Sequence, residues 1–274
     1  MVRASVTAAP RAATLAALAF APAILLAAPA AHAADMVALE DGIRLVRFTD
    51  DKPGVIGWRS IKGAAGKIVG IDVRPADGKL YGLGADGTVY LLDPATGVAT
   101  MKSKLGVAPA PDATVVDFNP VADRLRVVTA GGRSLRVNVD TGETIEDGKL
   151  AFAAGDANAG KMPAVTAGGY SNSTVGPKPA ATGLYEIDSK AAVLVLQDPP
   201  NAGTLVSKAK IGMPAQALRG GDVWTGADGK LTQFAVSGAR LYRIDVASGA
   251  LALVGNVGSG ERNLIDVAVL PPMK

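Results

Sequence analysis

The stretch Asp93-Pro94-Ala95-Thr96-Gly97 decides the fold of this 274-residue chain, because variants of it return at a regular interval. Two further copies read Asn138-Val139-Asp140-Thr141-Gly142 and Asp245-Val246-Ala247-Ser248-Gly249, and two degraded copies begin at Asp50 and Asp188. The spacing is 43 residues from Asp50 to Asp93 and 45 residues from Asp93 to Asn138. A fixed period of roughly 40–50 residues indicates a radial or solenoidal array of repeats.

The repeated stretch has a complete explanation as a turn. Its first side chain can accept backbone N–H bonds, and its Gly can take the left-handed conformation that ends such a hairpin loop. Asp-Gly pairs, such as Asp77-Gly78 and Asp86-Gly87, predict tighter hairpins between the preceding strands. We therefore interpret each unit as four short antiparallel strands, and the repeated residues as turn formers rather than ligand contacts.

The two termini are predicted to share one unit. Leu264–Val269 repeats the pattern of Ile71-Asp72-Val73, the first strand of a unit. The three missing strands are found at the other end of the chain, at Met36–Leu39, Ile43–Phe48 and Val55–Ile61. A shared unit closes a ring and protects its edges. The sequence thus predicts an all-β fold, a single five-bladed β-propeller closed by pairing of the C-terminal strand with N-terminal strands.

The first 33 residues have the composition of a secretory signal peptide. Arg3 and Arg11 precede a long apolar stretch, and Ala31-His32-Ala33 matches an A-x-A cleavage site. A retained membrane anchor is the alternative, because the apolar stretch is nearly long enough to span a bilayer. We expect residues 1–33 to be removed, leaving one β-propeller domain at residues 34–274. That domain would be periplasmic or extracellular and have no membrane attachment.

Removal of this segment narrows the available chemistry. His32 is the only histidine and the chain has no cysteine. Residues 34–274 would therefore lack His-based triads, thiol nucleophiles and disulfides, and zinc, copper or haem sites that need His or Cys. Loss of Arg3 and Arg11 lowers the net charge from +3 to +1, and no long Lys/Arg run exists. We expect no nucleic-acid partner, no cofactor and a monomer.

Several stretches resemble the bacterial family known as domain of unknown function 4394. They are Gly70–Pro75, Val116–Pro120, Asp123–Val128, Leu184–Asp188, Gln197–Leu205 and Leu241–Asp245. The resemblance covers essentially the whole of residues 34–274 and implies an exported, propeller-like domain. It implies no site residues, because the family has no established activity.

Four aspartates take the same position on the first strand of their units: Asp72, Asp117, Asp222 and Asp266. Gly169 takes this position in the third unit. Innermost strands line a propeller channel, so these carboxylates could converge and bind a cation or act as the carboxylate pair of a glycoside hydrolase. The structural alternative is that each bonds backbone N–H groups or pairs with Arg74, Arg124 or Arg126. Repetition favours the structural role. Catalytic residues have different tasks and need different positions, whereas residues that pack in equivalent surroundings repeat at equivalent positions.

A second candidate lies at Gly155–Gly160, which resembles a fragment of a calcium loop with Asp156 and Asn158 as its visible ligands. Calcium takes six to eight oxygen ligands, and no Glu follows at the expected spacing. An ordinary loop between units is the alternative.

The third unit contains two long irregular stretches, at residues 168–182 and 197–204. Long loops on a rigid scaffold often carry function. We expect a binding face there, against the alternative of an uneventful insertion. The candidate ligand-binding residues are Tyr170, Asn172, Lys178 and Asn201.

Two functions follow from these observations. The preferred one is a non-enzymatic, exported binding or scaffold module that uses one propeller face to bind a small molecule, a glycan or a protein. The alternative is a carboxylate-dependent, glycosidase-like hydrolase that acts at the channel. The fold cannot choose between them, since one scaffold hosts unrelated functions.

Overall fold

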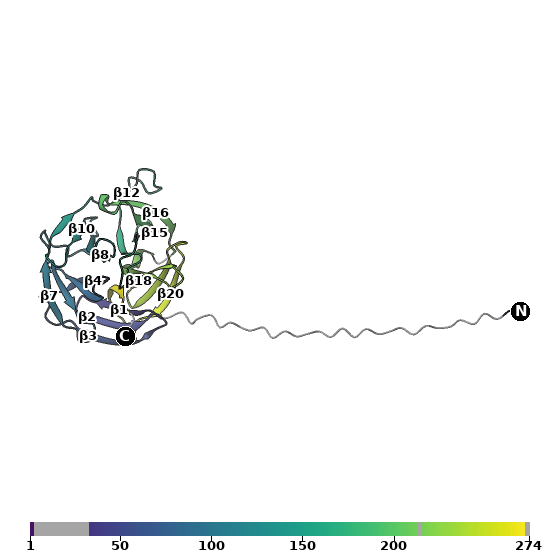
Figure 1. Ribbon diagram of the computed structural model, residues 1–274, viewed down its shortest axis with the longest axis horizontal. Coiled ribbons are helices and arrows are strands. Elements are labelled where there is room, and N and C mark those ends of the chain that lie inside the picture. Colours follow the sequence, from purple (N-terminus) through teal and green to yellow (C-terminus); the bar gives the residue numbers. More distant parts are fainter. Residues whose placement is uncertain (3–32, 213–214, 272–274) are drawn as a thin grey trace. The chain divides into compact units, whose positions relative to one another are not determined.

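The computed structural model describes residues 1–2, 33–212 and 215–271, and its folded unit is Ala33–Lys274. Five sheets stand around a common centre in that unit, so the fold is an all-β, five-bladed propeller, as the repeat predicts (Figure 1). The predicted signal segment, residues 1–33, lies outside the described residues except at its two ends. Among the described residues, no helix has the length and apolar character needed to span a membrane.

We number the blades along the chain and call the one shared by the termini blade 5. Blade 1 contains β4 (Ile68–Arg74), β5 (Lys79–Gly84), β6 (Thr88–Leu92) and β7 (Ala99–Lys104). Blade 2 contains β8 (Ala113–Asn119), β9 (Arg124–Thr129), β10 (Ser134–Val137) and β11 (Thr144–Glu146). Blade 3 contains β13 (Val165–Tyr170), β14 (Leu184–Asp188), β15 (Val193–Gln197), β16 (Thr204–Lys210) and β12 (Ala151–Phe152). Blade 4 contains β17 (Arg219–Thr225), β18 (Leu231–Ser237), β19 (Arg240–Asp245) and β20 (Leu251–Asn256). Blade 5 contains β21 (Leu264–Val269), β1 (Asp35–Glu40), β2 (Arg44–Thr49) and β3 (Lys52–Ser60).

Blade 5 closes the ring through the two ends of the folded unit. β21 pairs antiparallel with β1, with Val269 opposite Met36 and Val267 opposite Ala38. The Leu270 N–H donates to the Asp35 carbonyl at 2.8 Å and extends this pairing. The predicted closure of the ring by the C-terminal strand is therefore confirmed.

The repeated stretch forms the hairpin that the sequence predicts. In the first copy, Asp93 Oδ1 accepts the Ala95 N–H at 2.8 Å and Asp93 Oδ2 accepts the Thr96 hydroxyl at 2.7 Å. Gly97 has a φ of 80° and donates its N–H to the Asp93 carbonyl at 2.7 Å. A side chain at this φ would be strained, which explains why the copy ends in Gly.

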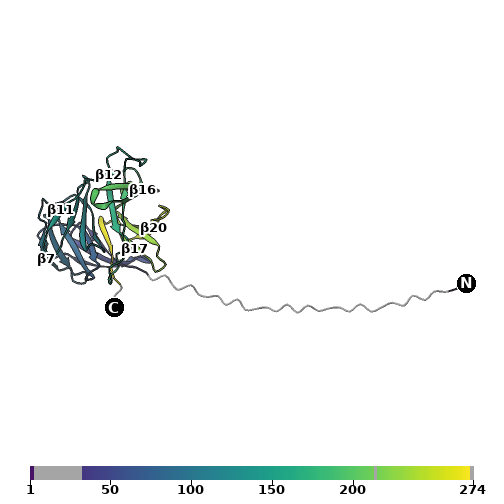
Figure 2. The same ribbon diagram turned by 45° about the horizontal axis from the view of Figure 1, so that its top comes forward.

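Blade 3 departs from the four-strand pattern. Its outer strand β16 follows a 3₁₀ turn at Pro200–Ala202, and the two-residue β12 runs parallel to β16 as a fifth strand (Figure 2). A strand of two residues leaves no readable periodicity in a sequence, so β12 was not predictable. β13 extends to Tyr170 and β16 begins at Thr204, so the predicted irregular stretches at 168–182 and 197–204 are ordered sheet at these ends.

Apolar side chains fill the interfaces between neighbouring blades. In the interface of blades 1 and 2, the rings of Tyr81 and Phe118 meet edge to face with their centroids 5.3 Å apart. The interface of blades 4 and 5 packs Phe234 of β18 against Met36 and Val46. Burial of such residues holds the blades rigidly in place, because each contributes about 1.5–3 kcal/mol.

Candidate functional site

The four repeated aspartates gather at the centre of the propeller. They lie on the innermost strands β4, β8, β17 and β21, and each is between 1% and 5% exposed. Asp72, Asp117 and Asp222 place one carboxylate oxygen each within 4.8 Å of the others. The structure therefore brings together the residues that the sequence analysis placed at equivalent positions. We call Asp72, Asp117, Asp222 and Asp266 the aspartate ring.

Each member of the aspartate ring accepts a backbone N–H from another blade. Asp72 Oδ2 accepts from Phe118 at 2.6 Å, and Asp117 Oδ1 accepts from Tyr170 at 2.8 Å. The other two bonds link blade 4 to blade 5 and blade 5 to blade 1. Asp222 Oδ2 accepts from Val269 at 2.7 Å, and Asp266 Oδ2 accepts from Ile71 at 2.8 Å.

Gly169 replaces aspartate on the innermost strand of blade 3. A Cβ at this position would lie 2.8 Å from the Val223 nitrogen and 2.9 Å from Asp117 Oδ2. The neighbouring blade and the Asp117 carboxylate therefore occupy the space that a fifth aspartate would need. The aspartate ring has four members because the fifth place is filled by its neighbours.

Burial and mutual repulsion shape the titration of the aspartate ring. Burial, followed by the charge of Asp222, raises the pKa of Asp72 well above its usual value. Burial and the charges of Asp72 and Asp222 do the same to the pKa of Asp117. Burial raises the pKa of Asp222 to about 6 and that of Asp266 to about 7. Burial and like charge thus disfavour full ionisation of the aspartate ring, and a bound proton or cation would relieve the repulsion.

Two chemical roles of the aspartate ring can be weighed against this geometry. Asp72, Asp117 and Asp222 supply carboxylate oxygens, the ligands that calcium prefers, although calcium takes six to eight of them. Glycoside hydrolysis needs a sugar to lie between two carboxyl groups. Side chains that are at most 5% exposed leave no access for a sugar ring. The interblade hydrogen bonds give the ring a structural task without either role.

Tyr170 and Asn201, two of the predicted ligand-binding residues, meet at one buried arginine. Arg126 is 1% exposed; its Nε donates to the Tyr170 hydroxyl at 3.2 Å and its Nη2 to Asn201 Oδ1 at 3.0 Å. Its Nη1 donates to Ser134 Oγ at 2.9 Å and to Asp147 Oδ2 at 2.7 Å. These bonds join blades 2 and 3, so both predicted residues have structural partners inside the protein.

The other two predicted ligand-binding residues lie at the surface. Asn172 has a φ of 59°, and its side-chain amide donates to the Ala181 carbonyl at 3.0 Å within the same loop. Lys178 is exposed. Together with Pro177 and Pro179 it lines a shallow depression with a volume of about 20 Å³. The structure brings neither residue to Tyr170 and Asn201 at the buried Arg126 cluster.

The predicted calcium ligands Asp156 and Asn158 bond to protein groups. Asp156 Oδ2 accepts the Ser207 N–H at 2.6 Å, and Asp156 Oδ1 accepts the Ser207 hydroxyl at 2.8 Å. Asn158 Oδ1 accepts from the Lys161 ammonium at 2.9 Å. A lysine thus supplies the positive charge that calcium would bring, and the segment is built as a loop that docks on β16.

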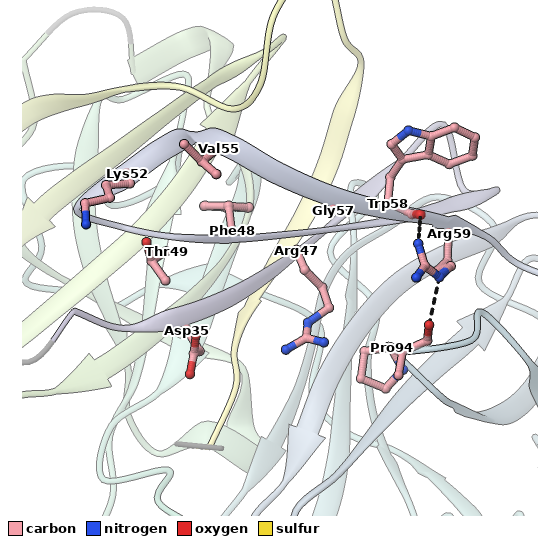
Figure 3. Close-up of a pocket in the computed structure, with 11 residues that line it drawn as sticks. Asp35, Arg47, Phe48, Thr49, Lys52, Val55, Gly57, Trp58, Arg59 and Pro94 are labelled. Carbon is pink, nitrogen blue, oxygen red and sulfur yellow. Dashed lines mark hydrogen bonds between the residues drawn. The ribbon is translucent and has the colours of Figure 1, made fainter. Parts of the chain in front are cut away.

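A cleft that the sequence analysis did not predict lies where blade 5 meets blade 1. It has a volume of about 410 Å³, and its walls are β2, β3 and the hairpin that begins at Asp93. Arg47 and Arg59 extend toward Pro94 of that hairpin, while Trp58 lies on the other side of β3 (Figure 3). Arg47 is also close enough to Asp93 for its charge to lower the pKa of that carboxyl, after the bonds from Thr96 and Ala95.

Two hydrogen bonds orient Arg59 at the cleft. Its Nε donates to the Ala95 carbonyl and its Nη1 to the Trp58 carbonyl, both at 2.8 Å. A guanidinium has five N–H donors. Within the part of the chain that the structure describes, these two bonds leave three donors of Arg59 available. The side chain is fixed in direction and still able to bind an anion.

Gly57 keeps the cleft open. It stands opposite Arg47 in the pairing of β2 with β3, and a Cβ built on it meets nothing within 4 Å. Any larger residue there would extend into the cleft beside Arg47. Gly54, on the same strand and outside the cleft lining, is equally open.

Two further depressions adjoin the cleft, one through Arg47, Pro94 and Ala95 and the other through Gly57, Trp58 and Arg59. The three surfaces together are rich in positive charge. Their linings include five cations and two carboxylates: Arg47, Lys52, Arg59, Lys62, Lys79, Asp35 and Asp93. Residues 34–274 as a whole carry a net charge near +1, so much of the positive excess is concentrated at this junction. The sequence signal that could have found the cleft is the outer strand β3, which carries Lys52, Arg59 and the 52% exposed Trp58.

The propeller is similar to solved structures of low sequence identity. A protein of unknown function from Bacteroides thetaiotaomicron has 17% identity and a TM-score of 0.51, with 88% of this chain covered and 65% of that one. This chain therefore corresponds to less than two thirds of that protein. A catalytically inactive virginiamycin B lyase from Staphylococcus aureus, with quinupristin, has 14% identity and a TM-score of 0.42, over 87% and 75% of the two chains. At 17% identity, the likeness to the first of these structures shows the fold alone.

The family comparison agrees with the resemblance seen in the sequence. Among curated proteins, none matches the chain. The family model described as "Domain of unknown function (DUF4394)" matches residues 44–268, which include strands from all five blades. The chain belongs to this family, whose function is unknown.

Proposed function

We propose that this protein is an exported, non-enzymatic binding module, and that the cleft between blades 5 and 1 holds an anionic group of its ligand. The observation that carries this proposal is Arg59, fixed by two backbone carbonyls at 2.8 Å and left with three donors. A guanidinium binds carboxylate or phosphate with two parallel hydrogen bonds. The cleft volume of about 410 Å³ lies in the range of roughly 300–1,000 Å³ typical of small-molecule sites.

The hydrolase alternative is less well supported. It places catalysis on the aspartate ring, whose members are at most 5% exposed. The centre of the propeller would have to open before a glycosidic bond could reach two carboxyl groups. The cleft at blades 5 and 1, in contrast, is open and positively charged.

The cleft is tested with simple anions. Isothermal titration calorimetry would measure binding of benzoate, butyrate and inorganic phosphate to the wild type and to Gly57→Val. We expect at least one anion to bind, and Gly57→Val to weaken that binding at least tenfold because its side chain fills the cleft. Gly54→Val, on the same open strand, should bind like the wild type. Binding of none of the three anions, or equal losses in both variants, would count against the proposal.

The export part of the proposal is supported by the environment of Ala34. Ala34 is 7% exposed, and its backbone N–H donates to Asp50 Oδ1 at 2.7 Å. Cleavage after Ala33 would convert this N–H into the α-ammonium group of the mature chain. The hydrogen bond would become an ion pair, which is the stronger interaction.

The processing step is tested by expressing the full chain in a bacterial host and sequencing the N-terminus of the exported protein. We expect it to begin at Ala34. Asp50→Asn should then lower the melting temperature of the processed chain more than that of the unprocessed one. Asp51→Asn is the matched control, because Asp51 bonds only to the exposed Thr49 hydroxyl and Lys52 among the described residues. An uncleaved chain that stays in the cytoplasm would disprove export.

A further inference from the structure

A second depression continues the cleft and has a different character. It has a volume of about 830 Å³ and shares Arg47, Pro94 and Ala95 with the cleft, so the two join at these residues. Leu80 and Leu92, each 2% exposed, form its floor. We call this depression the apolar groove.

The wall of the apolar groove leaves apolar surface in contact with solvent. Val98 is 48% exposed at the end of the hairpin that begins at Asp93, and Leu270 is half-buried after β21. Exposed apolar surface next to polar surface is typical of ligand-binding grooves. A ligand that covered Val98 and Leu270 would be stabilised by their removal from water.

The cleft and the apolar groove together are asymmetric. The cleft carries Arg47, Lys52 and Arg59 against the single carboxylate Asp35. The groove floor carries apolar side chains. A complementary ligand has a negative head for the first part and an unbranched apolar body for the second.

We infer that the ligand of this site is a medium-chain carboxylate, with its head at Arg59 and its alkyl chain along Leu80, Leu92 and Val98. This inference rests on the proposed function of the cleft. A carboxylate suits the guanidinium geometry at Arg59. A free carboxylate, rather than a membrane surface, fits a site whose positive charge lies inside a cleft of limited volume.

The probe is decanoate, used below its micelle-forming concentration, against the full processed protein. Butyrate has the same head and a shorter chain, and decanol has the same chain without charge. We expect decanoate to bind at least tenfold more tightly than either. Val98→Glu should weaken decanoate at least tenfold by placing a carboxylate in the groove. Met101 of β7 is 63% exposed and lies outside the groove lining, so Met101→Glu should leave decanoate binding unchanged.

Other outcomes overturn the inference in distinguishable ways. Equal binding of butyrate and decanoate, with both lost in Gly57→Val, would refute the alkyl chain and leave the proposed cleft intact. Decanol as tight as decanoate would refute the role of the charged head. If the protein sedimented with phosphatidylglycerol vesicles, the occupant of the site would be a membrane surface. Decanoate binding that appears only after deletion of residues 272–274 would make the occupant the C-terminus of this chain.

Discussion

At the scale of single residues, members of the aspartate ring differ in the number of hydrogen bonds they accept. Both oxygens of Asp72 accept a backbone N–H at 2.6 Å, from Val73 and from Phe118. Asn offers one acceptor oxygen, and its amino group would face the second donor. We expect Asp72→Asn to lower the free energy of unfolding by about 1–3 kcal/mol, the cost of a buried donor left without a partner. Urea unfolding at pH 6 would measure it.

Asp117→Asn is the matched comparison. The structure gives the Asp117 side chain one backbone N–H bond, from Tyr170 to Oδ1, which an Asn side chain can keep. Its amino group would then face neighbouring carboxylates, whose charges already raise the pKa of Asp117 after burial. We therefore expect a smaller loss than for Asp72→Asn. Equal losses would show that charge, rather than the number of acceptors, sets the role of the aspartate ring.

Glu186 of β14 predicts a pH dependence. It is fully buried, and among the described residues neither of its carboxyl oxygens has a hydrogen-bond partner. Burial raises the pKa of Glu186 to about 8 from an ordinary value of 4.5, although the charge of Arg126 opposes this. The folded protein thus keeps a proton that the unfolded chain loses. Stability is full below pH 4.5 and falls by about 1.4 kcal/mol per pH unit for this group until pH 8.

Glu186→Gln tests this sign. The amide has the same shape and does not ionise, so the variant should lose less stability than the wild type between pH 5 and pH 8. Asp222 and Asp266, with raised pKa values of about 6 and about 7, should still give both proteins a fall over the lower part of that range. Melting temperatures across pH would measure the difference. Parallel curves for the two proteins would disprove the raised pKa of Glu186.

The charge of the aspartate ring has a separate test. A melting temperature of the wild type that rises with added calcium would show that a cation balances the aspartate ring.

At the scale of elements, the repeated hairpin does more than turn the chain. A Cβ on Gly97 would overlap the Ser60 carbonyl at the end of β3, and one on Gly142 would overlap the Lys104 carbonyl at the end of β7. The Gly that ends each of these hairpins therefore touches the outer strand of the preceding blade. Sequence spacing predicted the turn, because its chemistry is local. It could not predict this contact, because the two segments are far apart in the chain.

Gly97→Ala separates these two contributions. The variant has the φ strain of an L-residue at 80° and also the overlap with Ser60. Gly229→Ala has nearly the same φ, 78°, with nothing within 4 Å of its Cβ. We expect Gly229→Ala to cost about 1 kcal/mol from the backbone alone and Gly97→Ala to cost at least twice as much. Equal losses of unfolding free energy in the two variants, measured by urea unfolding, would mean that the Ser60 carbonyl moves away from the new side chain without strain.

The strands and the candidate sites differed in how well the sequence predicted them. The strands predicted at Leu264–Val269, Met36–Leu39 and Ile43–Phe48 formed as β21, β1 and β2, close to these bounds. The aspartate ring was also predictable, since equivalent positions on equivalent strands converge in a closed ring. The cleft was not, because it depends on Gly57 lying opposite Arg47 and on Pro94 approaching from another blade.

At the scale of the whole molecule, stability depends on the strand that joins the two ends. β21 buries Leu264 and Val267 completely, and Asp266 accepts N–H bonds from Ile71 of blade 1 and Gly221 of blade 4. Deletion of residues 263–274 would remove one member of the aspartate ring and leave β1 without its inner partner. Each buried apolar side chain contributes about 1.5–3 kcal/mol, against a typical domain stability of about 5–15 kcal/mol.

We therefore expect the truncated chain to unfold or aggregate, although loss at a terminus is usually tolerated. A circular permutant provides the control: it joins Lys274 to Asp35 through a short linker and opens the chain at residues 106–109, between β7 and β8. It keeps every blade and should fold, because closure of the ring depends on the pairing of β21 with β1 and not on where the chain begins. Circular dichroism and size-exclusion chromatography would follow both proteins. A truncated chain that stays monomeric with an unchanged melting temperature would show that four blades and an open edge suffice.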